Sequence, residues 1–358
     1  MNAPVTRGVR DNDTIAYQRF VAAARGFWAN DLFAALRRQV RTPDTTADPQ
    51  AFASLVDAHP THRIFAFLER HLQRMRYSGP FGLVQRVERD RDALLASLCD
   101  PLPEGLLHLD PELSPPPYYA EFDIHQHPGG LGGDTLAALV YREAVGSGVV
   151  GQPALHRRFA QLVTAKTTPA RILDLGCGFG RSAWAFADAV PTASVLGLDL
   201  SASCLTVAAH DTPEHLRTRV SFAQADAAAT KLPRASFDLV TSTMLLHEMP
   251  EHAVRALIEE TGRVTSAGGV VAHLDFLPPD DPLLRILFAG HARRNNEPFL
   301  LEHARIDVAA AYARAGFARV ETFDFAEEDG ALDADFPRWR LPWKVILAVK
   351  DAAESPGQ

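Results

Sequence analysis

The sequence predicts an α/β protein in which a helical first part precedes a mostly parallel sheet of seven strands. From about Asp13 to Leu98, apolar residues recur at three- and four-residue spacing, which is the pattern of amphipathic helices. From Arg171 onward, short runs rich in leucine and β-branched residues alternate with helical stretches. Such runs are typical of parallel strands covered on both faces. We therefore expect a helical cap or dimerisation domain over residues 1–150 and a sheet domain over residues 151–358.

Loops and connectors interrupt the first part. Residues 41–50 read as a polar loop that contains proline, and residues 100–117 hold so many prolines that we expect an ordered connector without a regular element. A glycine-rich loop then leads to Asp134, which can cap a helix over residues 135–144. Residues 154–166 predict one more helix before the sheet begins.

Seven apolar runs are expected to form the strands of the sheet. The first five are separated by helical stretches and cover residues 170–176, 193–200, 219–226, 237–244 and 268–276. The last two runs, residues 317–325 and 343–350, come late in the chain, and we expect them to pair antiparallel at the edge of the sheet.

Composition and charge limit the possible functions. The chain of 358 residues has a formal net charge of −8, which argues against the broad basic surface that nucleic-acid binding requires. No apolar run approaches the roughly 18 residues that span a bilayer, and the opening stretch MNAPVTRGVRDNDT has no apolar signal-peptide core. The three cysteines, Cys99, Cys177 and Cys204, are far apart and favour reduced thiols. We expect a cytoplasmic protein, without nucleic-acid or membrane partners, that acts on a small molecule and forms a homodimer through its helical part.

The stretch ILDLGCGFGRSAWAF, residues 172–186, joins the first strand to a helix through an acid and three glycines. Gly176, Gly178 and Gly180 let the backbone approach a ligand at the carboxyl end of the sheet. Their spacing, G-x-G-x-G, differs from the dinucleotide fingerprint G-x-G-x-x-G, and Asp174 would repel a phosphate. A ligand with an ammonium group and no phosphate fits this turn better, although a nicotinamide-dependent enzyme is the rival interpretation.

The next two strands also end in acids. Asp199 is placed to accept hydrogen bonds from both hydroxyls of a ribose, because a carboxylate offers two oxygens. Asp226, followed by Ala227, can accept a hydrogen bond from an exocyclic amine such as that of adenine. Acids at three consecutive strand ends therefore predict a nucleoside with an amino-acid tail as the ligand, which is S-adenosylmethionine.

On these residues the chain resembles the class I S-adenosylmethionine-dependent methyltransferases. The resemblance runs from about Ala170 to Phe276 and is carried by LDLGCGFG, LGLDLS, AQADAAATKLP and FDLVTSTMLLHEMP. It implies a Rossmann-like fold for the second part and an enzyme that uses S-adenosyl-L-methionine. It covers roughly the C-terminal half of the chain and says little about residues 1–150.

The resemblance also implies roles for individual residues around the cofactor. It puts Asp174 and Gly176 near the methionine end, Asp199 on the ribose and Leu200 against the adenine. The adenine edge is expected at Asp226 and Ala227, and the cofactor backbone at Thr243. The remaining residues of the glycine turn that we expect to lie against the cofactor are Cys177, Gly178 and Gly180.

Methyl transfer needs the acceptor atom aligned with the methyl group, and it needs a base only where the acceptor carries a proton. His247 is the candidate general base, with Glu248 beside it, in LLHEMP after the fourth strand. We expect O-methylation of a small metabolite. Three alternatives stay open: S-, N- or C-methylation of a small acid, a non-catalytic binding protein of this fold, and a non-methylating enzyme that uses the sulfonium.

Substrate contacts are expected from three places. His125 and His127 flank a glycine-rich loop that can close over the cofactor, and Tyr118 and Tyr119 precede this loop. His273 and Asp275 follow the fifth strand. Alternate histidines are compatible with a metal, but the ligands that it would need are not fixed by the sequence, and we expect none.

Overall fold

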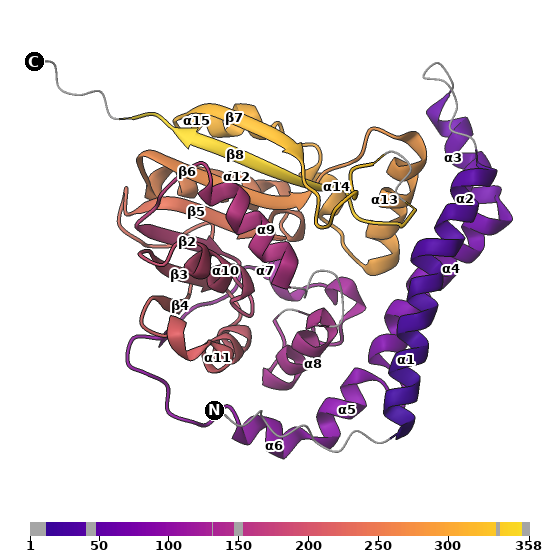
Figure 1. Ribbon diagram of the computed structural model, residues 1–358, viewed down its shortest axis with the longest axis horizontal. Coiled ribbons are helices and arrows are strands. Elements are labelled where there is room, and N and C mark those ends of the chain that lie inside the picture. Colours follow the sequence, from indigo (N-terminus) through magenta and orange to yellow (C-terminus); the bar gives the residue numbers. More distant parts are fainter. Residues whose placement is uncertain (1–11, 41–47, 131, 147–152, 334–336, 353–358) are drawn as a thin grey trace, which may run out of the picture.

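The computed structural model describes residues 12–40, 48–130, 132–146, 153–333 and 337–352. Figure 1 shows a sheet with helices on both faces and, beside it, an arm of long helices from the first part of the chain. A π-helical turn, Trp28–Leu32, joins the first two helices of this arm. The helices that precede residue 171 in the chain are α1 (Asn12–Phe27), α2 (Phe33–Gln39), α3 (Pro49–Ala58), α4 (Pro60–Tyr77), α5 (Leu83–Arg89), α6 (Arg91–Ala96), α7 (Pro117–Ala120), α8 (Thr135–Gly146) and α9 (Pro153–Thr164).

The long helix α4 follows directly from its sequence. Pro60 occupies its first turn, where the missing N–H costs nothing, and the His59 ring accepts a hydrogen bond from the Thr61 N–H at 3.3 Å. Phe65 and Leu72 on one face are buried, as the helical spacing predicts. The helical pattern that we predicted from Asp13 to Leu98 is thus confirmed in the described residues.

The second part contains the main sheet. Its strands run in the order β1-β4-β3-β2-β5-β6-β8-β7, with β2 to β6 parallel to their neighbours in this set and β8 antiparallel to both β6 and β7. The strands are β1 (Leu107–His108), β2 (Arg171–Leu175), β3 (Ser194–Asp199), β4 (Val220–Gln224), β5 (Phe237–Thr243), β6 (Thr265–Phe276), β7 (Phe317–Asp324) and β8 (Trp343–Lys350). The predicted antiparallel pair at the edge is confirmed.

The sheet has eight strands, so the predicted count of seven was wrong. The additional strand, β1, consists of two residues within the proline-rich connector and pairs parallel with β4 at the outer edge of the sheet. Leu107 lies opposite Phe222 in this pair. Proline fixes the flanking backbone but leaves residues 107 and 108 free to hydrogen-bond, which is why a count of prolines did not reveal the strand.

Helices cover both faces of the sheet, because successive side chains of a strand point to opposite sides. In β2, Ile172 packs in one core with α9 and α10 (Arg181–Ala189), whereas Leu173 packs in another with α12 (Glu251–Val264) and α15 (Val308–Arg314). The remaining helices are α11 (Ala202–Asp211), α13 (Pro282–Asn295) and α14 (Leu300–His303). Within the described residues, no helix combines the length and the apolar character that crossing a membrane requires.

The topology creates a cleft for a ligand. The chain runs outward from β2 through β3 to β4 and then returns to β5 on the other side of β2, so the order of strands reverses between β2 and β5. Ligands of open parallel sheets bind beyond the carboxyl ends of the strands at this reversal. The helix α13 contacts α3 and α4, and Figure 1 shows it between the arm and the sheet. The domain boundary that we proposed near residue 150 falls on residues outside the described set, and the division stays a proposal.

Close packing between α12 and α15 generates a first prediction. A Cβ on Gly262 would come within 2.6 Å of the Ala315 carbonyl oxygen, so Gly262→Ala must separate the two helices. We expect this change to lower the free energy of unfolding by about 1–3 kcal/mol, measured by urea denaturation. The matched control is Gly26→Ala in α1, where a Cβ meets nothing within 4 Å and the change is expected to add about 0.5–1 kcal/mol. Equal effects at the two positions would contradict this view of the packing.

Candidate active site

A cavity of about 420 Å³ lies at the carboxyl end of the sheet, between the strands and helices α1 and α4. This size falls within the range of about 300–1,000 Å³ that is usual for small-molecule sites. Most of the residues that we selected from the sequence meet in its wall. They are Tyr118, Tyr119, His125, Gly176, Cys177, Gly178, Asp199, Leu200, Asp226, Ala227, Thr243, His247 and Glu248.

The carboxylate of Asp199 is fixed by backbone groups at the end of β3. Its Oδ2 accepts a hydrogen bond from the Gly178 N–H at 2.8 Å, and its Oδ1 accepts one from the Ser201 N–H at 2.8 Å. Burial raises the pKa of Asp199 above its usual value, and these backbone donors oppose the rise only in part. Each oxygen keeps a second lone pair, so the group can still accept two hydrogen bonds from a ligand.

The glycine turn after β2 has the backbone that we predicted. Gly176, Gly178 and Gly180 all have positive φ angles, of 62°, 50° and 78°, which glycine adopts without strain. A Cβ on Gly176 would come within 2.7 Å of Leu245, whereas one on Gly178 would meet nothing within 4 Å. The turn is therefore tight at Gly176 and open at Gly178, on the side where the cavity lies.

Two further groups in the cavity wall suit a nucleoside with an amino-acid tail. The Oγ1 of Thr243, at the end of β5, is buried and has no hydrogen-bond partner among the described residues. Asp226 uses one oxygen to accept from the Ala228 N–H at 2.8 Å. Such unsatisfied or partly satisfied groups favour a polar ligand, because a buried hydroxyl without a partner is costly.

Asp174, which we expected near the methionine end of the cofactor, does not line the cavity. It is fully buried, its Oδ1 accepts from the Thr241 hydroxyl at 3.0 Å, and its Oδ2 accepts from the Ser182 hydroxyl. Burial raises its pKa to about 7 despite these donors. The side chain ties β2 to β5 and α10. Gly180 also lies outside the cavity wall, because it begins α10 behind the turn.

Cys177 lies in the cavity wall as a buried thiol. Burial, together with the charges of Asp199 and Asp174, holds its pKa well above the usual range. Because the thiolate is the nucleophilic form, this environment suits a packing role. Its N–H donates to the Leu198 carbonyl at 2.9 Å, which fixes the turn against β3.

His247 is held between two carboxylates. Its Nδ1 lies 2.6 Å from Asp275 Oδ1, and its Nε2 lies 3.4 Å from Glu248 Oε1. Burial alone would lower the pKa of His247, but the two carboxylates outweigh burial and raise the pKa to about 10. The imidazole is therefore protonated at neutral pH. This argues against the general-base role that we expected of His247, because an imidazolium has no lone pair to accept a proton.

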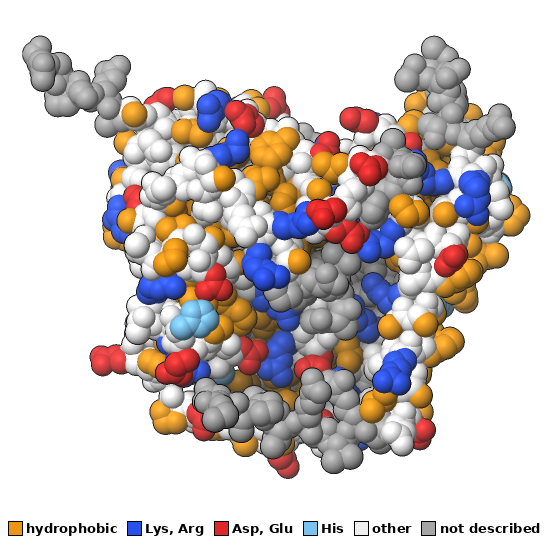
Figure 2. All heavy atoms as spheres, in the orientation of Figure 1, with side chains coloured by type: hydrophobic (Ala, Val, Ile, Leu, Met, Phe, Trp, Pro, Cys, Tyr) orange, Lys and Arg blue, Asp and Glu red, His pale blue; other side chains and the backbone are white. Residues whose placement is uncertain are grey.

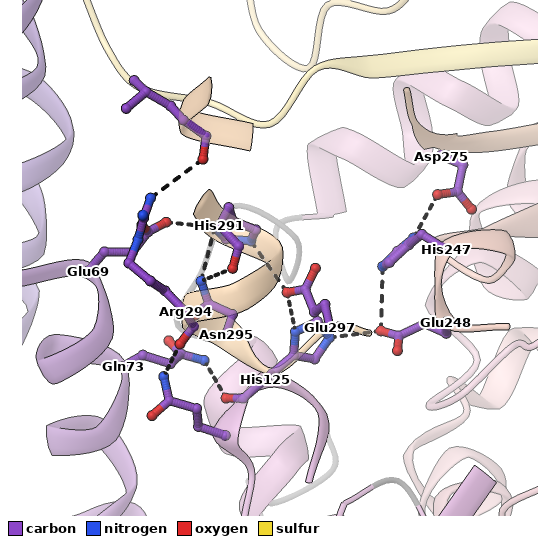
Figure 3. Close-up of polar contacts among 12 residues, drawn as sticks. Glu69, Gln73, His125, His247, Glu248, Asp275, His291, Arg294, Asn295 and Glu297 are labelled. Atoms are coloured by element: carbon purple, nitrogen blue, oxygen red, sulfur yellow. Dashed lines mark hydrogen bonds and ion pairs between the residues drawn. The ribbon is translucent and has the colours of Figure 1, made fainter. Parts of the chain in front are cut away.

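Glu248 has one free oxygen. Its Oε1 accepts from His125 Nε2 at 2.9 Å and faces His247, whereas its Oε2 is buried and has no hydrogen-bond partner among the described residues. The positive charges of His125 and His247 lower the pKa of Glu248, against the opposing effect of burial. Figure 3 shows this carboxylate between the two rings. Glu248 is thus ionised, lines the cavity and keeps one oxygen that accepts no hydrogen bond from the described residues.

From Glu248 an alternating series of acids and bases crosses to the helical arm, as Figure 3 shows. His125 Nδ1 lies 2.9 Å from Glu297 Oε1, which also lies 3.3 Å from His291 Nε2. The series ends at Glu69 of α4, whose Oε1 lies 2.7 Å from His291 Nδ1. These carboxylates overcome burial and raise the pKa of His125 to about 10 and that of His291 to about 9. The second oxygen of Glu69 accepts from Arg294. We call this series, Asp275–His247–Glu248–His125–Glu297–His291–Glu69, together with the Arg294 that pairs with Glu69, the ionic chain.

Strained backbone gathers around the ionic chain. His125, Gln126, Met244 and Asn296 have φ angles of 57°, 54°, 60° and 60°, in the left-handed region that residues other than glycine rarely adopt. Side chains hold this conformation: Gln73 donates to the His125 carbonyl at 2.9 Å, and Asn296 donates to the Asp123 carbonyl at 2.9 Å. Such strain persists where the surroundings fix it and is common at functional sites.

Of the remaining residues that we predicted to contact the substrate, some line the cavity and others are buried behind its wall. Tyr118 and Tyr119 line the cavity, and burial raises the pKa of Tyr118 to about 12. His127 and His273 do not line it: His127 Nε2 lies 2.9 Å from the Ala137 carbonyl, and His273 bridges the Ser242 and Tyr312 hydroxyls. Asp275 also lies behind the wall, where it holds His247. In the parts of the chain that the structure describes, no three His, Cys, Asp or Glu side chains are grouped so as to hold a metal ion.

Several charged residues of the cavity wall were not predicted from the sequence. Arg25 and Glu69 are the clearest, together with His291 and Glu297. A signal was present for the first two. Arg25 of α1 stands four residues after buried Val21 and three before buried Trp28, which begins the π-helical turn, and so lies on the apolar face of a predicted helix. Glu69 occupies the same kind of position in α4. A charge on an apolar helix face is costly unless something pairs with it, and it therefore marks a site.

The charge of His247 gives the second prediction. Of its two carboxylate partners, Asp275 raises the pKa of His247 more than Glu248 does. Asp275→Asn removes this charge but leaves the ring buried, so the pKa of His247 is expected to fall from about 10 towards neutrality. In the unchanged protein the ring is expected to stay protonated from pH 6 to 8. Proton–nitrogen correlation spectra of histidine-labelled protein measure this directly. His127, whose pKa burial and the charge of His125 lower to about 4, is the internal control and should stay neutral in both proteins. A neutral His247 ring at pH 7 in the unchanged protein would contradict this assignment.

The sheet part of the chain is similar to known methyltransferases. The family described as "Methyltransferase domain" matches residues 172–269. A malonyl-[acyl-carrier protein] O-methyltransferase of Geobacter sulfurreducens is 30% identical over 206 residues, which cover 56% of this chain and 74% of the relative. A trans-aconitate 2-methyltransferase of Methylobacterium nodulans is 32% identical over 183 residues, or 50% of this chain and 63% of the relative.

Among solved structures, an S-adenosylmethionine-dependent methyltransferase from Mesorhizobium loti has 23% sequence identity and a TM-score of 0.41, and the match covers 57% of this chain and 100% of that one. The chain spans 50%, 63% and 47% of the length of the first three curated relatives that it matches. With three quarters of the Geobacter sulfurreducens relative covered at 30% identity, the chain belongs to the class I S-adenosylmethionine-dependent methyltransferases.

Proposed function

We propose that this chain transfers a methyl group from S-adenosylmethionine to an oxygen atom of a small molecule. One observation carries the proposal: Glu248, whose buried Oε2 has no hydrogen-bond partner among the described residues, lines the same cavity as Asp199. An acid suited to a ribose and an acid suited to an acceptor's proton therefore line one cavity. The size of this cavity, about 420 Å³, favours a small acceptor over a macromolecule.

The residues of the cavity wall fit the cofactor. Asp199 would accept hydrogen bonds from the ribose hydroxyls, and the Thr243 hydroxyl, which has no partner among the described residues, would bond a polar atom of the amino-acid tail. Leu200 and Ala227 would lie against the adenine. When bound, the cofactor supplies an electrophilic methyl group, so that the protein has to align the acceptor and exclude water.

Glu248 is the group that we propose takes the acceptor's proton. Its Oε2 would accept the hydrogen bond of an acceptor hydroxyl and receive the proton as the new carbon–oxygen bond forms. His247 and His125 would hold Oε1 and fix the carboxylate in position. In this proposal His247 is a positioning residue, and the base that we assigned to it from the sequence is its neighbour.

The relatives support this choice of acceptor only in part. One is named as an O-methyltransferase, and another as a methyltransferase of trans-aconitate. The chain covers less than two thirds of several relatives, and the acceptor of this protein is accordingly proposed from its own cavity. The homodimer and the cytoplasmic location that we expected from the sequence also stay predictions.

Loss of the ribose acceptor gives the third prediction. Asp199→Ala removes hydrogen bonds to a charged group, which are worth about 1.5–3 kcal/mol, so the Kd for S-adenosylhomocysteine is expected to rise about 10- to 100-fold. Isothermal calorimetry measures this. Asp188→Ala is the control, because Asp188 is an exposed acid of α10 that pairs with His215 at the surface. If the two variants bind alike, the placement of the ribose is wrong, and if the unchanged protein does not bind at all, the function is wrong.

Removal of the proposed proton acceptor gives the fourth prediction. Glu248→Gln keeps the shape but not the charge, and kcat is expected to fall about 10²- to 10⁴-fold while the affinity for S-adenosylhomocysteine stays the same. Transfer of labelled methyl groups to a mixed metabolite extract measures the rate, and mass spectrometry of the product identifies the atom that is methylated. Glu251→Gln, in an exposed pair with Arg255 on α12, is the matched control. Full activity in Glu248→Gln would show that no base is needed there, and no transfer by the unchanged protein would exclude the reaction.

A further inference from the structure

One wall of the cavity carries an arginine, Arg25, that forms no ion pair with a carboxylate of the described residues. Arg25 lies in α1 on the face that also buries Val21 and Trp28, and it lines the cavity. A cation in such a place loses hydration, and proteins normally compensate for this with a carboxylate. The groups around the Arg25 guanidinium therefore decide whether its charge is compensated.

The partner of Arg25 is a neutral amide. Its Nη1 donates to Gln73 Oε1 at 2.8 Å, and the described residues offer it no ion pair. Glu69 is the acid of this wall whose charge acts on Arg25, but both of its oxygens are already engaged in the ionic chain by His291 and Arg294. Arg340, another arginine of the cavity wall, differs sharply because Glu327 binds it through both oxygens.

A second arginine stands close to the first. Arg76 of α4 also lines the cavity, and α1 and α4 are in contact. Burial first, and then the charge of Arg76, lower the pKa of Arg25 to about 10, which leaves it cationic at neutral pH. Figure 2 shows Lys and Arg side chains gathered around the hollow between the arm and the sheet. An anion in this part of the cavity would relieve both the desolvation and the repulsion.

We infer that Arg25 and Arg76 bind the carboxylate of the methyl acceptor, so that the substrate is a small acid. Two oxygens of a carboxylate match the fork of an arginine guanidinium. The two arginines belong to the helical arm, whereas Glu248 follows strand β5 of the sheet. In this inference the arm binds the carboxylate of the substrate, and the sheet domain provides the proton acceptor and the cofactor site. This inference rests on the proposed function, because it assigns the far end of the acceptor that Glu248 would deprotonate.

Aromatic side chains lie between the two ends. Tyr77 and Tyr141 line the cavity, and the ring of Tyr141 lies 5.7 Å from that of Phe179, which lines it as well. The ring of Tyr141 stacks 6.3 Å from that of His125, which pairs with Glu248. Tyr77 directly follows Arg76 in α4, so aromatic rings lie near both the arginines and the carboxylate. Flat apolar bodies pack well on such rings. The acceptor class that fits is a hydroxylated aromatic acid.

The fifth prediction compares acids with their neutral amides. The probes are 3-hydroxybenzoate, 4-hydroxybenzoate and 3,4-dihydroxybenzoate, each beside its carboxamide, titrated by calorimetry into the protein saturated with S-adenosylhomocysteine. We expect at least one acid to bind 10-fold or more tightly than its amide, and Arg25→Gln to remove this preference. Arg25→Lys keeps the charge but not the fork and is expected to retain part of it.

Arg19→Gln is the matched control, because Arg19 is an exposed arginine of the same helix. Binding of S-adenosylhomocysteine is measured first in every variant, and unchanged affinity demonstrates that the fold and the cofactor site are intact. Equal binding of acids and amides, or an acid preference that survives Arg25→Gln, would overturn the inference. So would the failure of every acid to bind at millimolar concentration while the cofactor product binds normally. Loss of cofactor binding in the unchanged protein would instead overturn the proposed function.

Discussion

The geometry of the site depends on one electrostatic constraint: the carboxylate of Glu248 is held between two imidazolium rings. His125 and His247 reach the same oxygen from opposite parts of the chain, and each ring is charged because a second carboxylate engages its other nitrogen. Removing any one member would leave a buried charge unpaired, which costs far more than an exposed pair contributes. The alternation of acids and bases therefore fixes both the position and the ionisation of Glu248.

The same ionic chain joins the two parts of the molecule. It begins at Asp275 on the sheet, passes through the strained loop of His125, and ends at Glu69 on the arm. The arm contributes Arg25 and Arg76 to the cavity, while the sheet contributes Asp199 and the glycine turn. Because residues of both the arm and the sheet line the cavity, its shape depends on a fixed position of the arm relative to the sheet. Buried ionic contacts suit this task, because their geometry allows little variation.

Much of the second part could be predicted from the sequence because its signals are local. Strand runs alternate with helices, and the glycines of the turn require positive φ angles, so strand positions, the turn and Asp199 follow from short stretches. The structural role of Asp174 could not be predicted from the sequence. The acid stands at a strand end, as predicted, but Thr241 and Ser182 occupy its oxygens from other elements. Such contacts between distant residues leave no local pattern.

The ionic chain could not be predicted either, because its members lie far apart in the sequence. His125 and Glu297 are 172 residues apart, and nothing in DIHQHPGG indicates that one histidine meets two carboxylates while His127, two residues later, packs into the core. The two-residue strand β1 was missed because propensity says little about so short a segment. Arg25 could have been found, since its place on the apolar face of α1 is visible in the sequence.

A crystal structure with bound S-adenosylhomocysteine is the most direct measurement of the central claim, that a cofactor and an ionised acid meet in one cavity. We expect the ribose hydroxyls on the Asp199 carboxylate and the sulfur on the side of the cavity that Glu248 lines. A nucleoside bound elsewhere, or one bound here with its sulfur turned away from Glu248, would contradict this claim.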